Sequence, residues 1–160
     1  MKARKDDAEG RKLVASNRKA RYDYEILEVL EAGLSLVGAE VKSLREGKAV
    51  LEGSFGRVEK GELFIFNLYI APYPHAHVDP PEPRRTRKLL VNRREVVRLE
   101  TRMRGKGLTL VPLALYFKRG WAKVEMALAR GKRGPDRRES IRKREETREL
   151  ERSFKGRIKL

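Results

Sequence analysis

The sequence predicts a mainly β domain, a small closed or partly open barrel of about six strands with one or two helices. Short apolar runs recur along the middle of the chain, and turns that contain glycine separate them. Such a pattern is typical of small antiparallel barrels. The chain has 160 residues, which suits one domain with one hydrophobic core.

The composition indicates a polyanionic partner. The chain has 39 Lys and Arg against 23 Asp and Glu, a net charge of +16, and such a basic excess is typical of nucleic-acid-binding proteins. No stretch approaches the roughly 20 apolar residues of a membrane-spanning helix, and the start lacks an apolar signal region. We therefore expect a cytoplasmic protein with no membrane partner. Because Cys is absent, disulfides and Cys-based zinc sites are excluded.

The first segment, residues 1–16, is polar and strongly charged, and we expect it to be a mobile extension. Within residues 22–37 the apolar positions alternate with a break at Gly33, which predicts a strand, a bend and a second strand. Apolar residues three apart within residues 41–46, followed by Gly47, predict a short helix that ends at the glycine.

Two runs, residues 50–58 and 62–70, predict a hairpin because Gly61 lies in the turn between them. The second run is almost entirely apolar, so we expect a strand that is covered on both faces at the centre of the core. The prolines that follow, between residues 72 and 83, predict an extended surface loop.

A helix is predicted for residues 92–104, because Asn92 and a glutamate three residues later have the spacing of a capping box. Residues 108–117 and 122–129 then predict a second hairpin with alternating apolar side chains inward. Pro112 removes one hydrogen-bond donor from the first of these strands, so we place it at an edge or a bulge.

The last segment, residues 131–160, has twelve Lys and Arg against six Asp and Glu and few large apolar residues. It cannot bury a core of its own. Its helix-forming composition, a capping-box spacing and a sparse apolar stripe predict a tail that is disordered when free and helical against a polyanion. The alternative is a purely electrostatic, solvated tail.

One carboxylate stands out in the basic run that follows Gly38. Glu40 lies close in sequence to Lys42 and Arg45, and a protein that only holds phosphates gains nothing from an acidic group that repels them. A carboxylate accepts hydrogen bonds from the exocyclic amines of bases, so this interpretation gives selectivity to Glu40 and affinity to Lys42 and Arg45. The alternative is an ordinary ion pair between Glu40 and a Lys or Arg.

Three separate blocks are more specific than the composition: Gly38–Lys48, Arg85–Asn92 and Leu128–Lys132. In this order they resemble the bacterial SsrA-binding protein family (small protein B), and the resemblance runs from about Asn17 into the tail. It implies an oligonucleotide-binding-type barrel of about six strands with two or three short helices at residues 17–130, and a basic C-terminal tail at residues 131–160. It also implies a non-enzymatic protein without a cofactor.

The resemblance implies a partner of transfer-messenger RNA (SsrA RNA) in the rescue of stalled ribosomes, or trans-translation. The barrel holds the tRNA-like part of the RNA, and the tail enters the empty messenger channel near the decoding region of the small subunit. Elongation factor Tu is implied as an indirect partner, by way of the RNA. The RNA contacts of the family fall on Glu40, Leu90 and Asn92, which otherwise suit an ion pair, the core and a helix N-cap.

The basic residues Arg84, Arg85, Arg87 and Lys88 are expected to clamp phosphates, with a solvated charge run as the alternative. A metal site at His75 and His77 has too few convergent groups, and no catalytic motif is supported, so we expect neither an enzyme nor a metalloprotein. An ordinary ribosomal protein or RNA chaperone shares the basic barrel and tail, and it is the alternative function.

In the tail, Asp136, Arg137 and Arg138 match the acidic-basic-basic motif of the family, which implies a role in the decoding region. Phe154 matches an apolar anchor of the family's tail. Pro135 departs from the pattern, because relatives often carry His or an aromatic residue there.

Overall fold

The barrel is a closed ring of antiparallel strands in the computed structural model, which describes residues 10–76, 79–132 and 134–158. Around the ring, each strand pairs with the next, and β8 and β9 close it. In ring order the strands are β8 (Leu108–Lys118), β4 (Phe55–Glu59), β5 (Glu62–Phe66), β7 (Arg87–Leu90), β2 (Tyr24–Leu34) and β9 (Trp121–Gly131). The mainly β barrel of about six strands is therefore confirmed.

Three short strands lie outside this ring. β3 (Ala49–Val50) pairs with β6 (Tyr69–Ile70), and β1 (Arg11–Ser16) pairs with the end of β8. The expected mobile extension over residues 1–16 is therefore wrong for β1, while residues 1–9 lie outside the described residues. Cross-strand hydrogen bonds to β8 hold β1 in place. Because β1 has no fully buried residue, its sequence carries no apolar pattern that would predict a strand.

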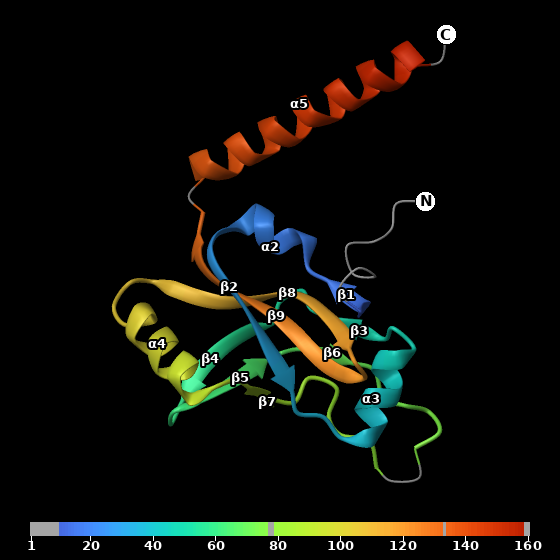
Figure 1. The fold of residues 1–160 in the computed structure, drawn as a ribbon, viewed down its shortest axis with the longest axis vertical. Helices are drawn as coiled ribbons and strands as arrows, with labels where there is room; N and C mark the ends of the chain where they lie inside the picture. Colours follow the sequence, from blue (N-terminus) through green and yellow to red (C-terminus); the bar gives the residue numbers. More distant parts are fainter. Residues whose placement is uncertain (1–9, 77–78, 133, 159–160) are drawn as a thin grey trace.

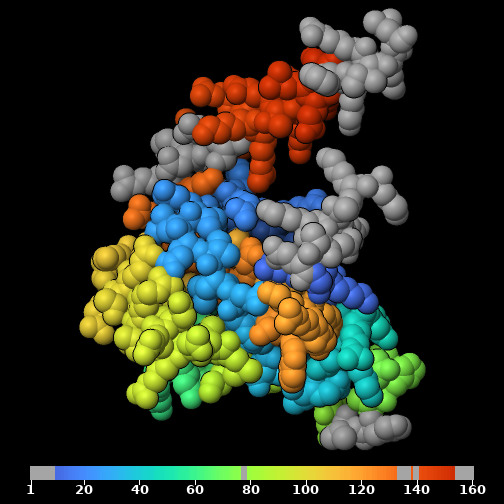
Figure 2. Space-filling view, in the orientation of Figure 1, coloured from blue at the N-terminus to red at the C-terminus, as the bar shows by residue number. Residues whose placement is uncertain are grey.

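Four helices occur among the described residues: α2 (Arg18–Asp23), α3 (Gly38–Arg45), α4 (Arg93–Met103) and α5 (Gly134–Ile158). Figure 1 shows α3 and α4 at opposite ends of the barrel and α5 extending away from it beyond α2. α5 also stands out from the rest of the surface in the space-filling view (Figure 2). Its helical form matches the conformation expected on a polyanion, and the order of the free tail stays a prediction.

The predicted strand, bend and strand over residues 22–37 is wrong. Tyr22 belongs to α2, and β2 is one strand of 11 residues with an irregularity in register between Ile26 and Glu28. Gly33 lies inside that strand rather than at a bend. A Cβ at Gly33 would lie 3.2 Å from the Cβ of Leu90 on β7, so the glycine permits close pairing of the two strands.

Both predicted hairpins form, with positive φ angles in their turns. Lys60 and Gly61 have φ of 50° and 74°, and Arg119 and Gly120 have φ of 52° and 81°, as in two-residue hairpin turns of type I′. The register of β8 against β9 shifts immediately after Pro112, which confirms the predicted bulge.

The expectation that the run at residues 62–70 is covered on both faces is wrong. Leu63 and Ile65 are buried in the barrel, but Phe64 and Phe66 point to the other face and stay partly exposed. Asn67, with φ of 63°, then ends β5 before the separate strand β6. An antiparallel strand with one solvated face gives this alternation.

The core fills the inside of the barrel, where the inward side chains of β5, β8 and β9 meet. Fully buried examples are Ile65, Leu110, Val124, Met126 and Leu128. On α4, Val96 and Leu99 join the same core. The wall is tightest at Gly56, where a Cβ would lie 2.9 Å from both Leu110 Cβ and Met126 Cε. None of the described helices is long and apolar enough to cross a membrane.

Candidate nucleic-acid interface

Three hollows lie on the barrel surface around α3, the β8–β9 turn and the start of α4, and we call them together the Leu90 track. The first opens at the start of α3, the second lies between α3 and the β8–β9 turn, and the third lies between β2 and the start of α4. Val37 lines the first hollow, its sequence neighbour Leu36 lines the second, and Leu90 lines both the second and the third. Characteristic lining residues are Val37, Lys42 and Tyr73 in the first, Val41, Trp121 and Lys123 in the second, and Val29, Asn92 and Glu95 in the third.

Leu90 and Asn92 are both presented to solvent in this track. Leu90 is 52% exposed, so its alternative assignment to the core is wrong. Asn92 is the N-cap residue of α4, as expected, but its side chain makes no cap hydrogen bond within the described chain. Its amide therefore keeps donor and acceptor capacity for a ligand.

Glu40, in contrast, lies inside the fold with 3% of its surface exposed. One carboxylate oxygen lies 2.5 Å from Arg85 Nη2 and the other 2.6 Å from Arg87 Nε. The backbone N–H of Val37 donates a third bond, at 3.1 Å. In the structure this carboxylate is not presented to a base edge. It forms ion pairs with Arg85 and Arg87, as the alternative interpretation had it.

These bonds control the ionisation of Glu40. Burial alone raises the pKa of its carboxyl group, but hydrogen bonds from Arg85, Val37 and Arg87 outweigh burial and hold that pKa below its ordinary value. A charged carboxylate at neutral pH follows, and it compensates the charge of a guanidinium in the interior.

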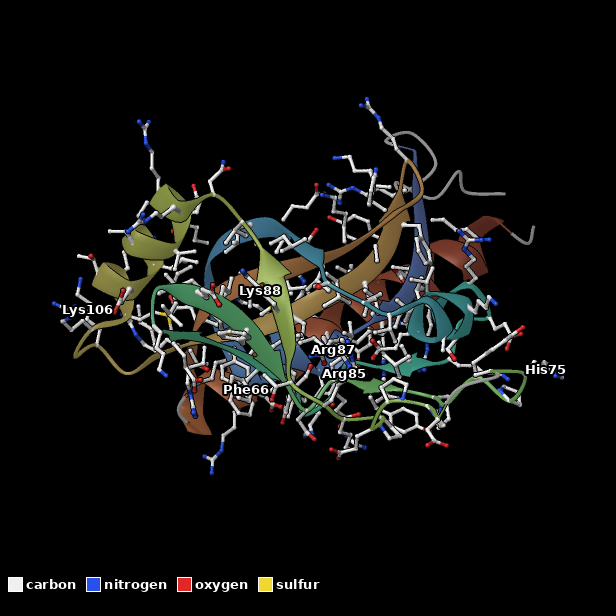
Figure 3. All side chains as sticks on the ribbon, turned by 90° about the horizontal axis from the view of Figure 1, so that it is seen from below. Phe66, His75, Arg85, Arg87, Lys88 and Lys106 are labelled. Carbon is white, nitrogen blue, oxygen red and sulfur yellow. The ribbon has the colours of Figure 1, made fainter. Side chains whose placement is uncertain are left out.

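Arg87 is the interior partner, and its expected role as a phosphate clamp is wrong in this structure. It is 1% exposed, and besides Glu40 it donates to the carbonyl oxygens of Leu68 at 2.6 Å and Pro83 at 3.0 Å. Successive side chains of a strand point to opposite faces of the sheet, and the side chain of Arg87 points to the inner face of the barrel. It therefore ties α3, β7 and the proline-rich loop together. Figure 3 labels Arg87 next to Arg85.

The remaining predicted cations are exposed or partly exposed. Lys42 on α3 lies over the ring of Tyr73, 5.4 Å from its centroid. Arg45 faces solvent, and the Arg85 side chain is 31% exposed while it holds Glu40. Lys88 is exposed on β7 and forms an ion pair with Glu62 at 3.2 Å.

Two residues of the Leu90 track, Trp121 and Lys123, were not predicted as site residues from the sequence. Trp121 at the β8–β9 turn is 73% exposed, and Lys123 follows it on the same hairpin end. A large aromatic side chain directly after a hairpin turn was the available signal, since a turn rarely buries it. The track also contains the carboxylates of Glu28 and Glu31, which were assigned no role.

Of the predicted tail residues, Arg138 is exposed on α5, and the side chains of Asp136, Arg137 and Phe154 lie outside the described residues. α5 contacts the barrel domain through Arg144, whose guanidinium lies 5.6 Å from the ring centroid of Tyr22 on α2. The described residues contain no cluster of three or more His, Asp or Glu that could hold a metal ion. Figure 3 shows His75 at the end of the molecule opposite Lys106, and His77 lies outside the described residues.

Comparison with known proteins gives a consistent result. A family model described as "SmpB protein" matches residues 14–156. An SsrA-binding protein of Pelotomaculum thermopropionicum is 53% identical over 149 residues, which cover 93% of this chain and 97% of that one. An SsrA-binding protein of Syntrophobacter fumaroxidans is 53% identical over 150 residues, covering 94% and 93%. A solved structure described as "tmRNA-SmpB: a journey to the center of the bacterial ribosome" has a chain with 54% identity and a TM-score of 0.64, covering 80% of this chain and 94% of that one.

Proposed function

Because the chain belongs to the SmpB protein family, we propose that it binds the tRNA-like domain of transfer-messenger RNA and delivers that RNA to stalled ribosomes. The family is an RNA-binding one, and we propose that this member is not an enzyme and acts in the cytoplasm. The observation that carries the proposal is the Leu90 track, where an exposed leucine lines one hollow with the asparagine amide of Asn92 and another with Lys123 of the β8–β9 hairpin.

Each part of the track has a suitable role in RNA recognition. Lys42 in the track, and Arg45 and Lys88 outside it, offer charges to phosphates, and their contribution to affinity is expected to fall with salt. Leu90 supplies an apolar contact to a base or ribose, and Asn92 supplies an amide that hydrogen-bonds a base edge.

Glu40 serves the same site from within. Its carboxylate holds two nitrogen atoms of Arg85, Nε at 3.2 Å and Nη2 at 2.5 Å, so the direction of that guanidinium is fixed. A fixed guanidinium loses less freedom when it meets a phosphate than a mobile one does. We assign Arg85 to the RNA contact and Glu40 to its orientation.

The tail has a separate role in this proposal. α5 carries its charges on an exposed helix, which suits the phosphate-lined messenger channel of the small subunit near the decoding region. Asp136, Arg137, Arg138 and Phe154 are the residues proposed to act there. Elongation factor Tu takes part by way of the RNA rather than through this chain.

Titration against two RNAs tests the proposal. The full-length protein is titrated with the tRNA-like domain of transfer-messenger RNA and with an unrelated structured RNA of equal length, at several salt concentrations. A preference for the tRNA-like domain that survives high salt is expected. Equal affinities that fall together with salt would support a general RNA chaperone or ribosomal protein instead.

Asn92→Ala sharpens the same experiment. This variant removes the amide and keeps the charge, and we expect it to lower the affinity for the tRNA-like domain by about tenfold, as for the loss of one base contact, while the unrelated RNA is unaffected. Arg104→Ala, at the other end of α4, is the control that lowers both affinities slightly.

A further inference from the structure

The outer face of the β4–β5 hairpin carries aromatic rings that the core does not use. Phe55 and Phe66 are cross-strand partners, and their rings stack with centroids 5.4 Å apart and planes 10° from parallel. Both side chains stay partly exposed, as does Phe64 on the same face. Aromatic side chains on a solvated sheet face form the stacking platform of several RNA-binding modules.

A guanidinium group covers this ring pair. The Arg57 Cζ atom lies 5.6 Å from the ring centroid of Phe55 and 5.1 Å from that of Phe66. The Arg57 side chain is itself 57% exposed, and its Nη1 lies 3.5 Å from Glu59 at one edge. The outermost layer is therefore a partly exposed guanidinium held over two rings.

A second cation–aromatic pair, formed by Arg84 and Tyr69, is linked to the first through Asn67. The Arg84 guanidinium lies 5.2 Å from the ring centroid of Tyr69 and donates to the carbonyl and side-chain oxygens of Asn67, both at 3.3 Å. Asn67 directly follows Phe66, so one residue links the two pairs. The same Asn67 donates to the carbonyl oxygen of Gly53, which fixes the connection to β4.

A hollow of about 250 Å³ opens beside Phe55. Lys19 and Tyr24 line it together with Glu52, and Lys19 forms an ion pair with Glu52 at 3.4 Å. A further aromatic ring and a further cation therefore line this hollow, together with the carboxylates of Asp23 and Glu52. These residues and the two stacks are not among those that line the Leu90 track.

The chemistry of this face selects its ligand. An apolar protein surface would have to desolvate Arg57 and Arg84, which is costly for charged groups. A nucleobase stacks on a guanidinium plane without that cost, and its phosphates meet the cations at the rim. Glu59 and Glu62 repel phosphates at the turn of the hairpin, so the strand of RNA is expected to run toward Arg84 and Lys19 instead.

We propose that the face formed by Phe55, Arg57, Phe66, Tyr69 and Arg84 is a second RNA-binding site, which stacks bases of unpaired RNA. It is separate from the Leu90 track, and it does not depend on which RNA that track binds.

Fluorescence anisotropy with a labelled ten-nucleotide oligouridylate tests this site in the full-length protein. Arg57→Lys keeps the charge but removes the planar guanidinium, and it is expected to weaken binding by about tenfold, the size of one lost stacking contact. Phe66→Leu, which keeps an apolar side chain, should give a similar loss. Lys106→Ala removes an exposed cation at the end of the molecule near α4 and should leave most of the affinity. Circular dichroism confirms that each variant is folded.

Three outcomes would overturn the proposal. Oligouridylate affinity that is unchanged in Arg57→Lys would exclude stacking on the guanidinium, and an equal loss in Lys106→Ala would indicate general electrostatic attraction. An equal loss for the tRNA-like domain in Arg57→Lys would make this face part of the first site. Absence of a preference for the tRNA-like domain in the unmodified protein would instead refute the proposed function and leave this inference standing.

Discussion

The barrel and helix α5 are both basic, but they hold their cations differently. In the barrel, Arg87 is buried against Glu40, and Arg98 and Arg102 both pair with Glu28. On α5, residues 141–153 are exposed throughout. The geometry of these three barrel cations is therefore fixed by carboxylates, whereas α5 offers a high charge density on an exposed helix. Fixed cations suit selective recognition, and exposed ones suit a sequence-independent polyanion.

Deletion of residues 134–160 is expected to have the largest effect among the tests of this comparison. Because the barrel does not use α5 for its core, we expect the shortened protein to bind the tRNA-like domain within about threefold of the full chain. Rescue of stalled ribosomes, measured as peptide tagging in a reconstituted translation system, should be abolished.

A loss of tRNA-like RNA binding on deletion would break the comparison, since α5 would then contribute to selectivity. A variant in which α5 keeps its composition but has its residues 141–153 in reversed order is the matched control. Retained rescue by that variant would show that charge density is sufficient.

Glu40→Gln tests the fixed cations of the barrel. The substitution keeps the shape of the side chain but leaves the charge of Arg87 uncompensated in the interior, which should lower the free energy of unfolding by about 3–5 kcal/mol. Urea denaturation followed by circular dichroism measures the change. Glu62→Gln, which removes an exposed partner of Lys88, should cost less than about 1 kcal/mol, and equal effects of the two variants would contradict the role of the buried pair.

Gly56→Ala tests the rigidity of the wall that holds these groups. The new methyl group would meet Leu110 and Met126 at 2.9 Å, and overpacking of this kind costs about 1–3 kcal/mol. Thermal unfolding should show the lower stability, whereas Ser153→Ala at an exposed position on α5 should leave the barrel transition unchanged. A wall that accepts the methyl group without loss would show that the barrel is less closely packed than its core residues indicate.

Acid unfolding gives the smallest of these effects. The pKa of Glu40 is lowered from 4.5 in the folded protein, so the unfolded chain takes up the proton first as the pH falls below that value. The stabilisation is complete above pH 4.5 and is lost as the pH falls through the folded-state pKa. Stability of the unmodified protein should therefore decline more steeply below pH 4.5 than that of Glu40→Gln. Glu31, whose pKa is also lowered, keeps some acid sensitivity in both, and parallel curves would exclude a contribution from Glu40.

Local signals predicted much of the fold. The two hairpin turns, the helix that begins after Asn92 and the bulge at Pro112 each depend on residues close together in sequence. β1 and α2 were missed because neither buries enough apolar surface to leave a periodic pattern; Ala20 is the buried residue of α2. Both elements are stabilised by contacts with residues far away in the sequence, and such contacts cannot be inferred from local composition.

The site divides in the same way. Lys42, Leu90 and Asn92 line the Leu90 track, and their contact with RNA stays a prediction. The burial of Arg87 was not predictable, because Glu40 lies 47 residues away and the neighbours of Arg87 are also basic. The exposure of Leu90 depends on which face of β7 turns outward, and a continuous apolar run carries no information on that.

The junction between β9 and α5 has a mechanical consequence. Lys132 follows β9, and its backbone N–H and its Nζ donate to the carbonyl oxygens of Asp23 and Arg21, at 2.9 and 3.0 Å. The chain is thus clamped to the end of α2 immediately before the long helix begins. A helix of 25 residues is about 38 Å long, so a rotation of about 10° at this clamp moves its far end by about 7 Å. α5 therefore turns about a point near α2, and the Arg144–Tyr22 contact lies between that point and the far end of the helix.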